Sequence, residues 1–239
     1  MTTHTNLPYE GLRVVEFTHM VMGPTCGMVL ADLGAEVIKV EPIGHGRHGD
    51  STRQLLGSGA GFFPMFNRNK KSMALDLQTP EGKEAVLRLI ATADVVSENF
   101  KPGTMKKLGL DYDSLKALNP RLVYVSHKGF LPGPYEHRTA LDEVVQMMGG
   151  LAYMTGPEER PLRAGTSVND IMGGLFGAIG AMAALKQREV TGVGQEVQSA
   201  LFENNTLLVG QHMMQYAATG KAPSPMPSRI SAWGIYDVF

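Results

Sequence analysis

Asp170 is the residue whose type and surroundings best fit covalent chemistry. It stands at the start of an expected helix rich in small residues, and Gly173 and Gly174 follow it. A helix N-terminus favours an ionised carboxylate, which can act as a nucleophile, and the glycines would admit a bulky ligand. The same position also suits a plain N-cap, in which the carboxylate only accepts a helix N–H. The residues alone favour the cap.

Two loops carry groups that can bind a ligand. His19-Met20-Val21-Met22-Gly23-Pro24 follows one expected strand, and Glu98-Asn99-Phe100-Lys101-Pro102-Gly103 follows another. Ligands of an open α/β sheet bind outside the carboxyl ends of its strands. The amide, aromatic ring and lysine of the second loop can hold a purine and a phosphate. A simpler interpretation is that this loop only caps the helix after it.

Three cations lie within four residues, in Arg68-Asn69-Lys70-Lys71. A solvated turn is the simpler interpretation, and an anion site for phosphates is the sharper one. Glu41 ends another expected strand and imitates the ribose-binding acid of a dinucleotide fold. The glycine fingerprint G-x-G-x-x-G is missing, however, so the sequence disfavours a nicotinamide or flavin site.

The composition excludes several classes of protein. The 239 residues include 22 Lys or Arg and 23 Asp or Glu, so no basic surplus favours a nucleic-acid partner. Cys26 is the single cysteine, which excludes an internal disulfide and a Cys-based zinc site, and the seven histidines form no metal motif. Residues 1–7 are polar, and the apolar stretch 171–185 is short for a membrane span. We expect a cytoplasmic protein with no metal, no tightly bound cofactor and no membrane partner.

Strand and helix signals alternate along the first half of the chain. Apolar, β-branched runs predict strands at residues 12–17, 36–40, 73–77, 94–97, 122–126 and 194–199. Helical spacing and start signals, such as Thr79-Pro80-Glu81, predict helices at 25–33, 79–93, 103–108, 112–118, 140–148, 170–186 and 201–216. This alternation predicts an α/β fold with a doubly wound parallel sheet. Residues 233–239 look like a further strand with nothing after it to pair with, so we expect the native polypeptide to continue.

The whole pattern resembles the class III coenzyme A transferases, the family of formyl-CoA transferase, carnitine CoA-transferase and the bile-acid-inducible F protein. The resemblance runs from about residue 12 to the end of the chain. The motifs that carry it are Val14-Val15-Glu16-Phe17-Thr18-His19, Leu30-Ala31-Asp32-Leu33-Gly34-Ala35-Glu36-Val37-Ile38-Lys39-Val40-Glu41-Pro42, Asn69-Lys70-Lys71-Ser72, Glu98-Asn99-Phe100 and Asn119-Pro120-Arg121-Leu122.

This resemblance implies an architecture and an activity. Residues 1–200 would form a Rossmann-like CoA-binding domain, and residues 201–239 a linking helix and the beginning of a smaller domain. Two subunits would form an interlocked homodimer. The protein would move coenzyme A from an acyl-CoA donor to a small carboxylic acid, with CoA as substrate rather than cofactor. Aspartyl anhydride and aspartyl-CoA thioester intermediates would form on the way.

The resemblance also assigns roles to particular residues. Asp170 looks like the family's catalytic aspartate. The positions that match the lining of the family's CoA site are Met20, Val21, Met22, Leu75, Asn99, Phe100 and Lys107. Pro42 replaces a CoA-binding arginine and Gln78 a lysine, so the phosphate contacts must differ. Val21 replaces an active-site glutamine, which disfavours formyl-CoA as donor with oxalate as acceptor.

Two other functions stay open. The pattern also resembles α-methylacyl-CoA racemase, which shares the fold but catalyses proton transfer. That reaction needs a histidine as well as the aspartate. Leu141 stands where that histidine belongs, and His137 lies four residues earlier, so transfer is the stronger hypothesis. A non-catalytic CoA-binding role is the third.

Overall fold

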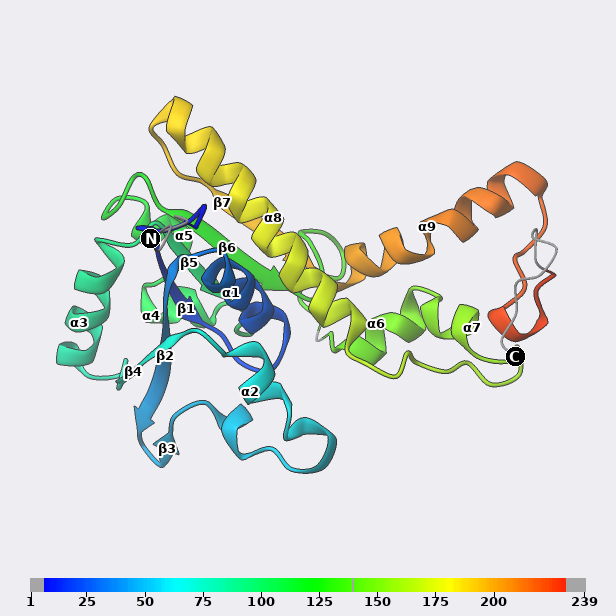
Figure 1. Cartoon of the computed structure of the whole chain (residues 1–239), viewed down its shortest axis with the longest axis horizontal. Coiled ribbons are helices and arrows are strands. Elements are labelled where there is room, and N and C mark those ends of the chain that lie inside the picture. The colour runs from blue at the N-terminus through cyan, green and yellow to red at the C-terminus, as the bar shows by residue number, and fades with distance from the viewer. Residues whose placement is uncertain (1–6, 139, 231–239) are drawn as a thin grey trace, which may run out of the picture.

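Seven strands form the sheet in the part of the chain that the computed structural model describes, residues 7–138 and 140–230 (Figure 1). They are β1 (Arg13–Phe17), β2 (Glu36–Gly44), β3 (Arg47–His48), β4 (Lys71–Leu75), β5 (Val95–Glu98), β6 (Val123–Lys128) and β7 (Glu196–Ala200). The parallel strands lie in the order β4-β2-β1-β5-β6-β7, and β3 folds back antiparallel on the end of β2. The chain moves outward from β1 in both directions, which confirms the doubly wound α/β prediction. The strand expected at 233–239 lies outside the described residues.

Each predicted helix is present with shifted ends, and two further short helices, at residues 62–66 and 151–155, were not predicted. The helices are α1 (Met22–Asp32), α2 (Phe62–Phe66), α3 (Pro80–Ile90), α4 (Thr104–Leu108), α5 (Tyr112–Leu115), α6 (Asp142–Met148), α7 (Leu151–Thr155), α8 (Val168–Thr191) and α9 (Leu201–Thr219). The start signal of α3 is confirmed, because Thr79 Oγ1 accepts the N–H of Gly82 at 3.1 Å. Short 3₁₀ turns, η1 (Ser51–Gln54), η2 (Gly57–Gly59) and η3 (Met226–Ser228), occupy segments to which the sequence assigned no element.

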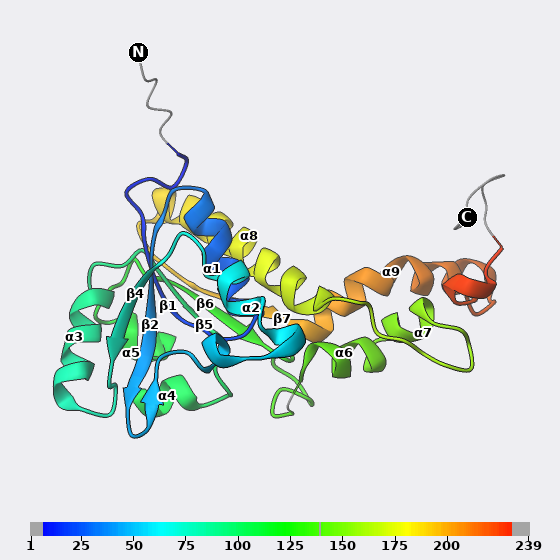
Figure 2. The same cartoon turned by 60° about the horizontal axis from the view of Figure 1, so that its bottom comes forward.

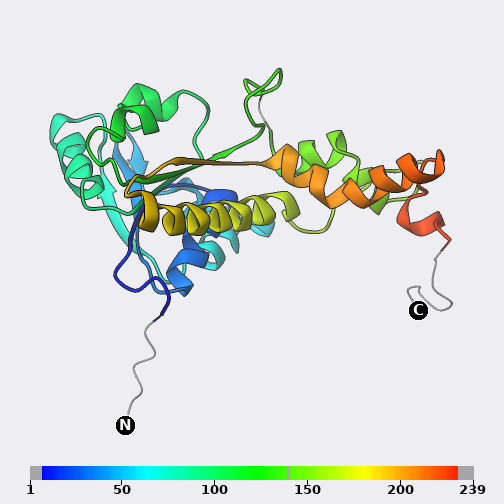
Figure 3. The same cartoon turned by 90° about the horizontal axis from the view of Figure 1, so that it is seen from above.

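Helices cover the two faces of the sheet with separate apolar cores. Val14 and Val95, which pair in register, point toward α1 and α8, whereas the next pair, Val15 and Val96, points toward α3, α4 and α5. Figure 3 shows the yellow helix α8 on one side of the strands and the green helices on the other. Because side chains alternate along a strand, each strand buries one set of valines in each core.

The glycines of α8 bring this helix against α1 and β6. A Cβ at Gly174 would lie 2.4 Å from Thr25 Cβ and 2.5 Å from the carbonyl oxygen of Met22, and one at Gly177 would lie 2.3 Å from His127 Cε1. The prediction that this helix packs closely is therefore confirmed. The expectation that Gly173 and Gly174 admit a ligand is wrong, because α1 fills that space.

By length and composition α8 is also the one helix of the described chain that could cross a membrane. One face of it packs in the core against α1 and the sheet, through Ala178, Ala181 and Leu185. Asn169 near its start and Arg188 near its end are both buried, and the Arg188 guanidinium pairs with Asp94 at 2.8 Å.

Helices α6, α7 and α9 project beyond the carboxyl edge of the sheet as an arm (Figures 1 and 2). The arm leaves the sheet where β7 ends, since α9 begins at Leu201, the residue after β7. Within it α9 packs against α6 and α7. The start of α8 therefore lies where the arm meets the sheet.

Candidate active site

The loop after β1 and the loop after β5 are joined through two residues. The His19 backbone N–H donates to Asn99 Oδ1 at 2.9 Å, and Asn99 Nδ2 donates to the His19 carbonyl at 2.8 Å. The His19 ring stacks on Phe100, with 5.9 Å between centroids and 23° between planes. Burial lowers the pKa of His19. Strands β1 and β5 flank the point where the strand order reverses, which is where open α/β sheets bind ligands.

Met20, Val21 and Met22 lead from this point into α1. Met20 has a left-handed backbone with a φ of 60°, and its side chain is 38% exposed. Val21 and Met22 are buried. Val21 packs in a cluster to which Ile171 of α8 contributes. The loop therefore reaches from the β1–β5 edge to the residue beside Asp170.

Leu75 and Lys107 lie near the same edge but on the face that α3, α4 and α5 cover. Leu75 ends β4, in register with Pro42 of β2, and packs in the same core as Phe100. Lys107 is exposed on α4. The structure thus brings Leu75, Phe100 and Lys107 to one face of the sheet and Asp170 to the other, with the loop after β1 between them.

Asp170 is not the cap of α8. The helix begins two residues before it, at Val168, so Asp170 lies in the first turn. The capping carboxylate is Asp142 of α6, whose Oδ2 accepts the backbone N–H groups of Asn169 at 2.7 Å and Asp170 at 3.1 Å. The cap interpretation of Asp170 is wrong, because α8 begins before it and the side chain that accepts N–H groups at this helix start belongs to Asp142.

The carboxyl group of Asp170 is also not held ionised by the helix. Burial is the largest cause that raises its pKa, and with the smaller effects of the Asp142 and Glu143 charges the pKa reaches about 7. Burial and these two charges thus oppose the ionised form that the helix start was expected to favour. A partly buried carboxylate with a high pKa is a stronger base and nucleophile than a solvated one, once it has lost its proton.

The N–H groups of Gly173 and Gly174 are not available as oxyanion donors. They lie inside α8 rather than in a turn, and an N–H in the helix interior bonds to the carbonyl four residues earlier. That part of the sequence-based hypothesis is wrong.

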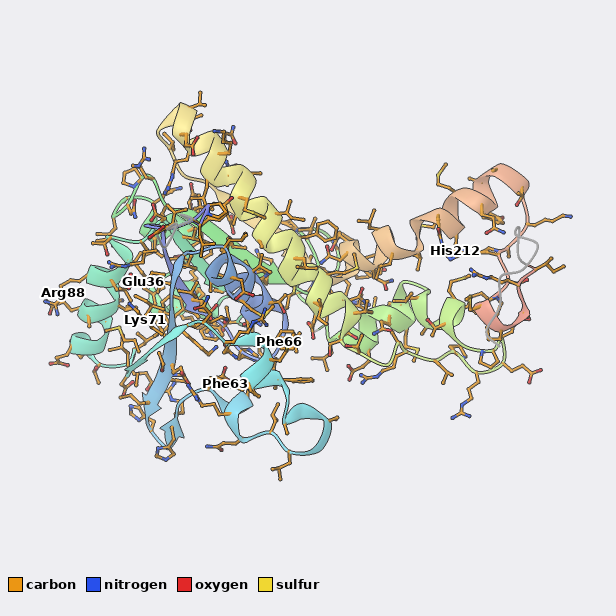
Figure 4. The ribbon with its side chains drawn as sticks, in the orientation of Figure 1. Glu36, Phe63, Phe66, Lys71, Arg88 and His212 are labelled. Atoms are coloured by element: carbon orange, nitrogen blue, oxygen red, sulfur yellow. The ribbon has the colours of Figure 1, made fainter. Side chains whose placement is uncertain are left out.

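The basic stretch before β4 consists of paired side chains rather than a phosphate site. Lys70 Nζ is buried and lies 2.8 Å from Glu16 Oε1. Lys71 lies 2.6 Å from Glu36 on the neighbouring strand, and Figure 4 shows these two side chains together. Arg68 pairs with Asp32.

Glu41 is likewise no ribose ligand. Arg53 binds both of its carboxylate oxygens at 2.7 Å, and Ser72 Oγ donates to it at 2.6 Å. Its burial would raise its pKa, but these hydrogen bonds and one from the Asp50 backbone lower it to about 2.

Sequence reasoning missed the capping role of Asp142. It also missed Thr52, whose hydroxyl accepts the Met20 N–H at 3.0 Å. Asp142 lies 27 residues before the first N–H it accepts, so no local spacing could reveal the pair.

Leu141, at the position of a racemase histidine, is 55% exposed at the start of α6. In residues 7–138 and 140–230 no three His, Cys, Asp or Glu side chains are grouped to hold a metal ion.

An apolar cleft of about 440 Å³ opens in the arm, between α7 and α9. Tyr153, Val209, His212 and Tyr216 line it, and Figure 4 labels His212 on α9. None of the site residues expected from the sequence lines this cleft.

Comparisons with known proteins agree with this fold. The model of CoA-transferase family III matches residues 9–239. Acetyl-CoA:oxalate CoA-transferase of Acetobacter aceti is 39% identical over 97% of this chain and 60% of its own length. Formyl-CoA:oxalate CoA-transferase of Rhodopseudomonas palustris is 44% identical over 80% of this chain and 46% of its own length.

Solved structures give the same result. A CAIB/BAIF family protein from Brucella suis superposes with a TM-score of 0.86 at 44% identity, covering 92% of this chain and 60% of its own. A hypothetical protein from Mycobacterium tuberculosis gives 0.81 at 40% identity, covering 90% and 60%. The chain thus spans about 60% or less of the length of these relatives. On this evidence the chain belongs to CoA-transferase family III.

Proposed function

We propose that the full-length protein transfers coenzyme A from an acyl-CoA donor to a carboxylic acid, with Asp170 as the nucleophile. The observation that carries this proposal is the place of the Asp170 carboxyl, partly buried in the first turn of α8, where burial raises its pKa to about 7. It stands next to Ile171, which packs with Val21 of the loop after β1. The names of the relatives, all CoA-transferases, support the same reaction class.

The reaction follows from a carboxylate and a thioester held together. An Asp170 oxygen attacks the thioester carbonyl, a C–O bond forms, the C–S bond breaks, and CoA leaves as thiolate. The thiolate then attacks the aspartyl carbonyl of the mixed anhydride and releases the donor acid as carboxylate, which leaves an aspartyl-CoA thioester. An acceptor carboxylate repeats both steps in reverse and regenerates Asp170.

The CoA moiety would lie along the carboxyl edge of the sheet. The loop of Met20, Val21 and Met22 and the loop of Asn99 and Phe100 meet there through the His19–Asn99 hydrogen bonds. Leu75 and Lys107 lie on the adjoining face, and the exposed ammonium of Lys107 is suited to a phosphate. Pro42 and Gln78 supply no positive charge, so more of this contact would fall to Lys107.

We also propose that the protein is a cytoplasmic, interlocked homodimer. The surface of helix α9 supports this proposal, because four of its large apolar side chains are each at least half exposed: Leu207, Met213, Met214 and Tyr216. Large apolar side chains gathered on one element are typical of protein interfaces.

The test is to trap the covalent adduct on full-length protein. Acetyl-CoA, succinyl-CoA and formyl-CoA, the donors in the relatives' names, are each mixed with the protein and then hydroxylamine. We expect an Asp170 hydroxamate by peptide mass spectrometry, and none in Asp170→Asn. Glu143→Gln is the matched control, since it removes a neighbouring exposed acid and should leave the adduct. Exchange of an acyl α-proton with solvent, without adduct or transfer, would instead identify a racemase.

A further inference from the structure

The loop that leads from β1 into the site is held at consecutive backbone positions by side chains from other elements. Lys39 Nζ of β2 donates to the Thr18 carbonyl at 2.5 Å. Asn99, after β5, exchanges two hydrogen bonds with the backbone of His19. A loop fixed in this way has its conformation set before any ligand arrives.

Met20, the next residue, adopts a conformation that needs such support. Its φ of 60° lies in the left-handed region, which is unfavourable for a residue with a long side chain and persists only where neighbouring groups hold it. The group that holds it is Thr52, the second residue of η1. The Met20 N–H donates to Thr52 Oγ1 at 3.0 Å.

The Thr52 hydroxyl is itself oriented by a buried carboxylate. It donates to Asp50 Oδ1 at 2.7 Å, and the Thr52 N–H donates to the same oxygen at 2.9 Å. The other Asp50 oxygen lies 3.0 Å from Lys39 Nζ. Thr52, Asp50 and Lys39 are 1%, 5% and 2% exposed. Since the hydroxyl proton is taken by Asp50, the oxygen is left to accept from Met20.

We propose that Thr52, oriented by Asp50 and Lys39, is a positioning residue that sets residues 18–22 in the conformation that receives acyl-CoA. The inference rests on the proposed function, in which this loop lines the CoA site. A loop that is already ordered does not lose conformational entropy when the substrate binds. The ordered loop therefore binds acyl-CoA more tightly than a mobile loop would. Thr52 itself touches no reacting atom, and its effect passes through the Met20 backbone.

The experiment compares Thr52→Val, which is nearly isosteric but lacks the hydroxyl, with Thr52→Ser, which keeps it. In full-length protein we expect Thr52→Val to raise the KM for acyl-CoA about tenfold, the scale of one lost buried hydrogen bond. The kcat and the KM for the acceptor acid should change by less than about threefold, and Thr52→Ser should restore the wild-type KM.

The control is Thr92→Val, at an exposed threonine of the opposite, amino end of the sheet. The Thr92 hydroxyl also has two partners, accepting from Arg13 Nη1 at 2.8 Å and donating to the Leu89 carbonyl at 2.9 Å. Its loss should leave the KM for acyl-CoA unchanged. An equal rise in both valine variants would show a general stability effect and overturn the proposal.

A second measurement needs no CoA. Hydrogen exchange of the peptide spanning residues 18–22 in the free protein should be faster in Thr52→Val than in wild type, and unchanged in Thr92→Val. Unchanged exchange, or a Thr52→Val enzyme with the wild-type KM, overturns the positioning role. If wild type neither binds CoA nor transfers it, the proposed function fails, while the exchange experiment still decides whether Thr52 holds the loop.

Discussion

The Asp142 carboxylate accepts the backbone N–H of Asp170 at 3.1 Å, so the two acids share one helix start. Asp142 receives the hydrogen bonds that a helix N-terminus offers to an anion, because it also accepts the N–H of Asn169. Asp170 receives the opposite influence: burial and the Asp142 charge raise its pKa to about 7. The pair therefore divides a capping role and a titrating role between two like residues.

The first prediction is a pH-dependent transfer rate. Asp170 must lose its proton to attack the thioester, and its pKa is about 7. We expect kcat/KM to rise with pH through about 7 and to level off above it. Initial rates measured on both sides of neutrality test this. An acid limb near the ordinary aspartate value of 3.8 would show that Asp170 is ionised throughout.

Asp142→Asn should move that limb to lower pH. Asparagine keeps an oxygen that accepts the α8 N–H groups but removes the negative charge that raises the pKa of Asp170. Burial, the larger cause, remains, so the limb should stay above 3.8. Glu143→Gln is the control, since Glu143 is the smaller of the two charge effects and should give a smaller shift. Equal limbs in Asp142→Asn and wild type would contradict the coupling.

Asp170→Asn should stabilise the fold at alkaline pH. The folded-state pKa of about 7 lies above the ordinary 3.8, so the native state binds this proton more tightly than the unfolded state. The free energy of unfolding of wild type therefore falls as pH rises from about 4 to about 7. Asparagine avoids this loss, which we place on the order of 1–2 kcal/mol after solvent screening. Urea denaturation should show a larger difference at pH 8 than at pH 5, because wild type has lost only part of this free energy at pH 5. A loss of stability in Asp170→Asn at both pH values would mark a cap.

Gly174→Ala should destabilise the fold by about 1–3 kcal/mol. The added Cβ would meet Thr25 Cβ at 2.4 Å and the Met22 carbonyl oxygen at 2.5 Å, and a backbone atom cannot move aside as a flexible side chain can. Gly210→Ala in α9 is the control, because nothing lies within 4 Å of its Cβ. There alanine should be neutral or stabilising by up to about 1 kcal/mol. Similar urea midpoints for the two variants would contradict the packing argument.

The sheet and its order of helices could be predicted because their signals are local. Thr79 and Pro80 mark the start of α3, and Gly34 has the positive φ of 106° expected where α1 ends. The valines of β1 and β5 indicated buried parallel strands. Each of these features depends on residues a few positions apart.

The candidate site could be predicted in its members but not in its electrostatics. Asp142 and Asp170 are in contact although they lie 28 residues apart in sequence. Lys70 pairs with Glu16, which lies 54 residues away. No spacing pattern records such pairs, so the sequence could not distinguish the capping acid from the titrating one. For the same reason the sequence could not show that Arg68, Lys70 and Lys71 each form an ion pair with a distant acid.

The late arrival of β7 has a consequence for folding during synthesis. β6 ends at Lys128 and pairs in parallel with β7, which begins only at Glu196, after α6, α7 and α8. Pairings of such high contact order form slowly, and until Ala200 leaves the ribosome one edge of β6 stays bare. That edge belongs to a strand whose first five residues are buried in the finished sheet. A nascent chain that stalls within α8 therefore presents unpaired backbone amides and carbonyls on a strand whose first half is apolar, which is a template for aggregation.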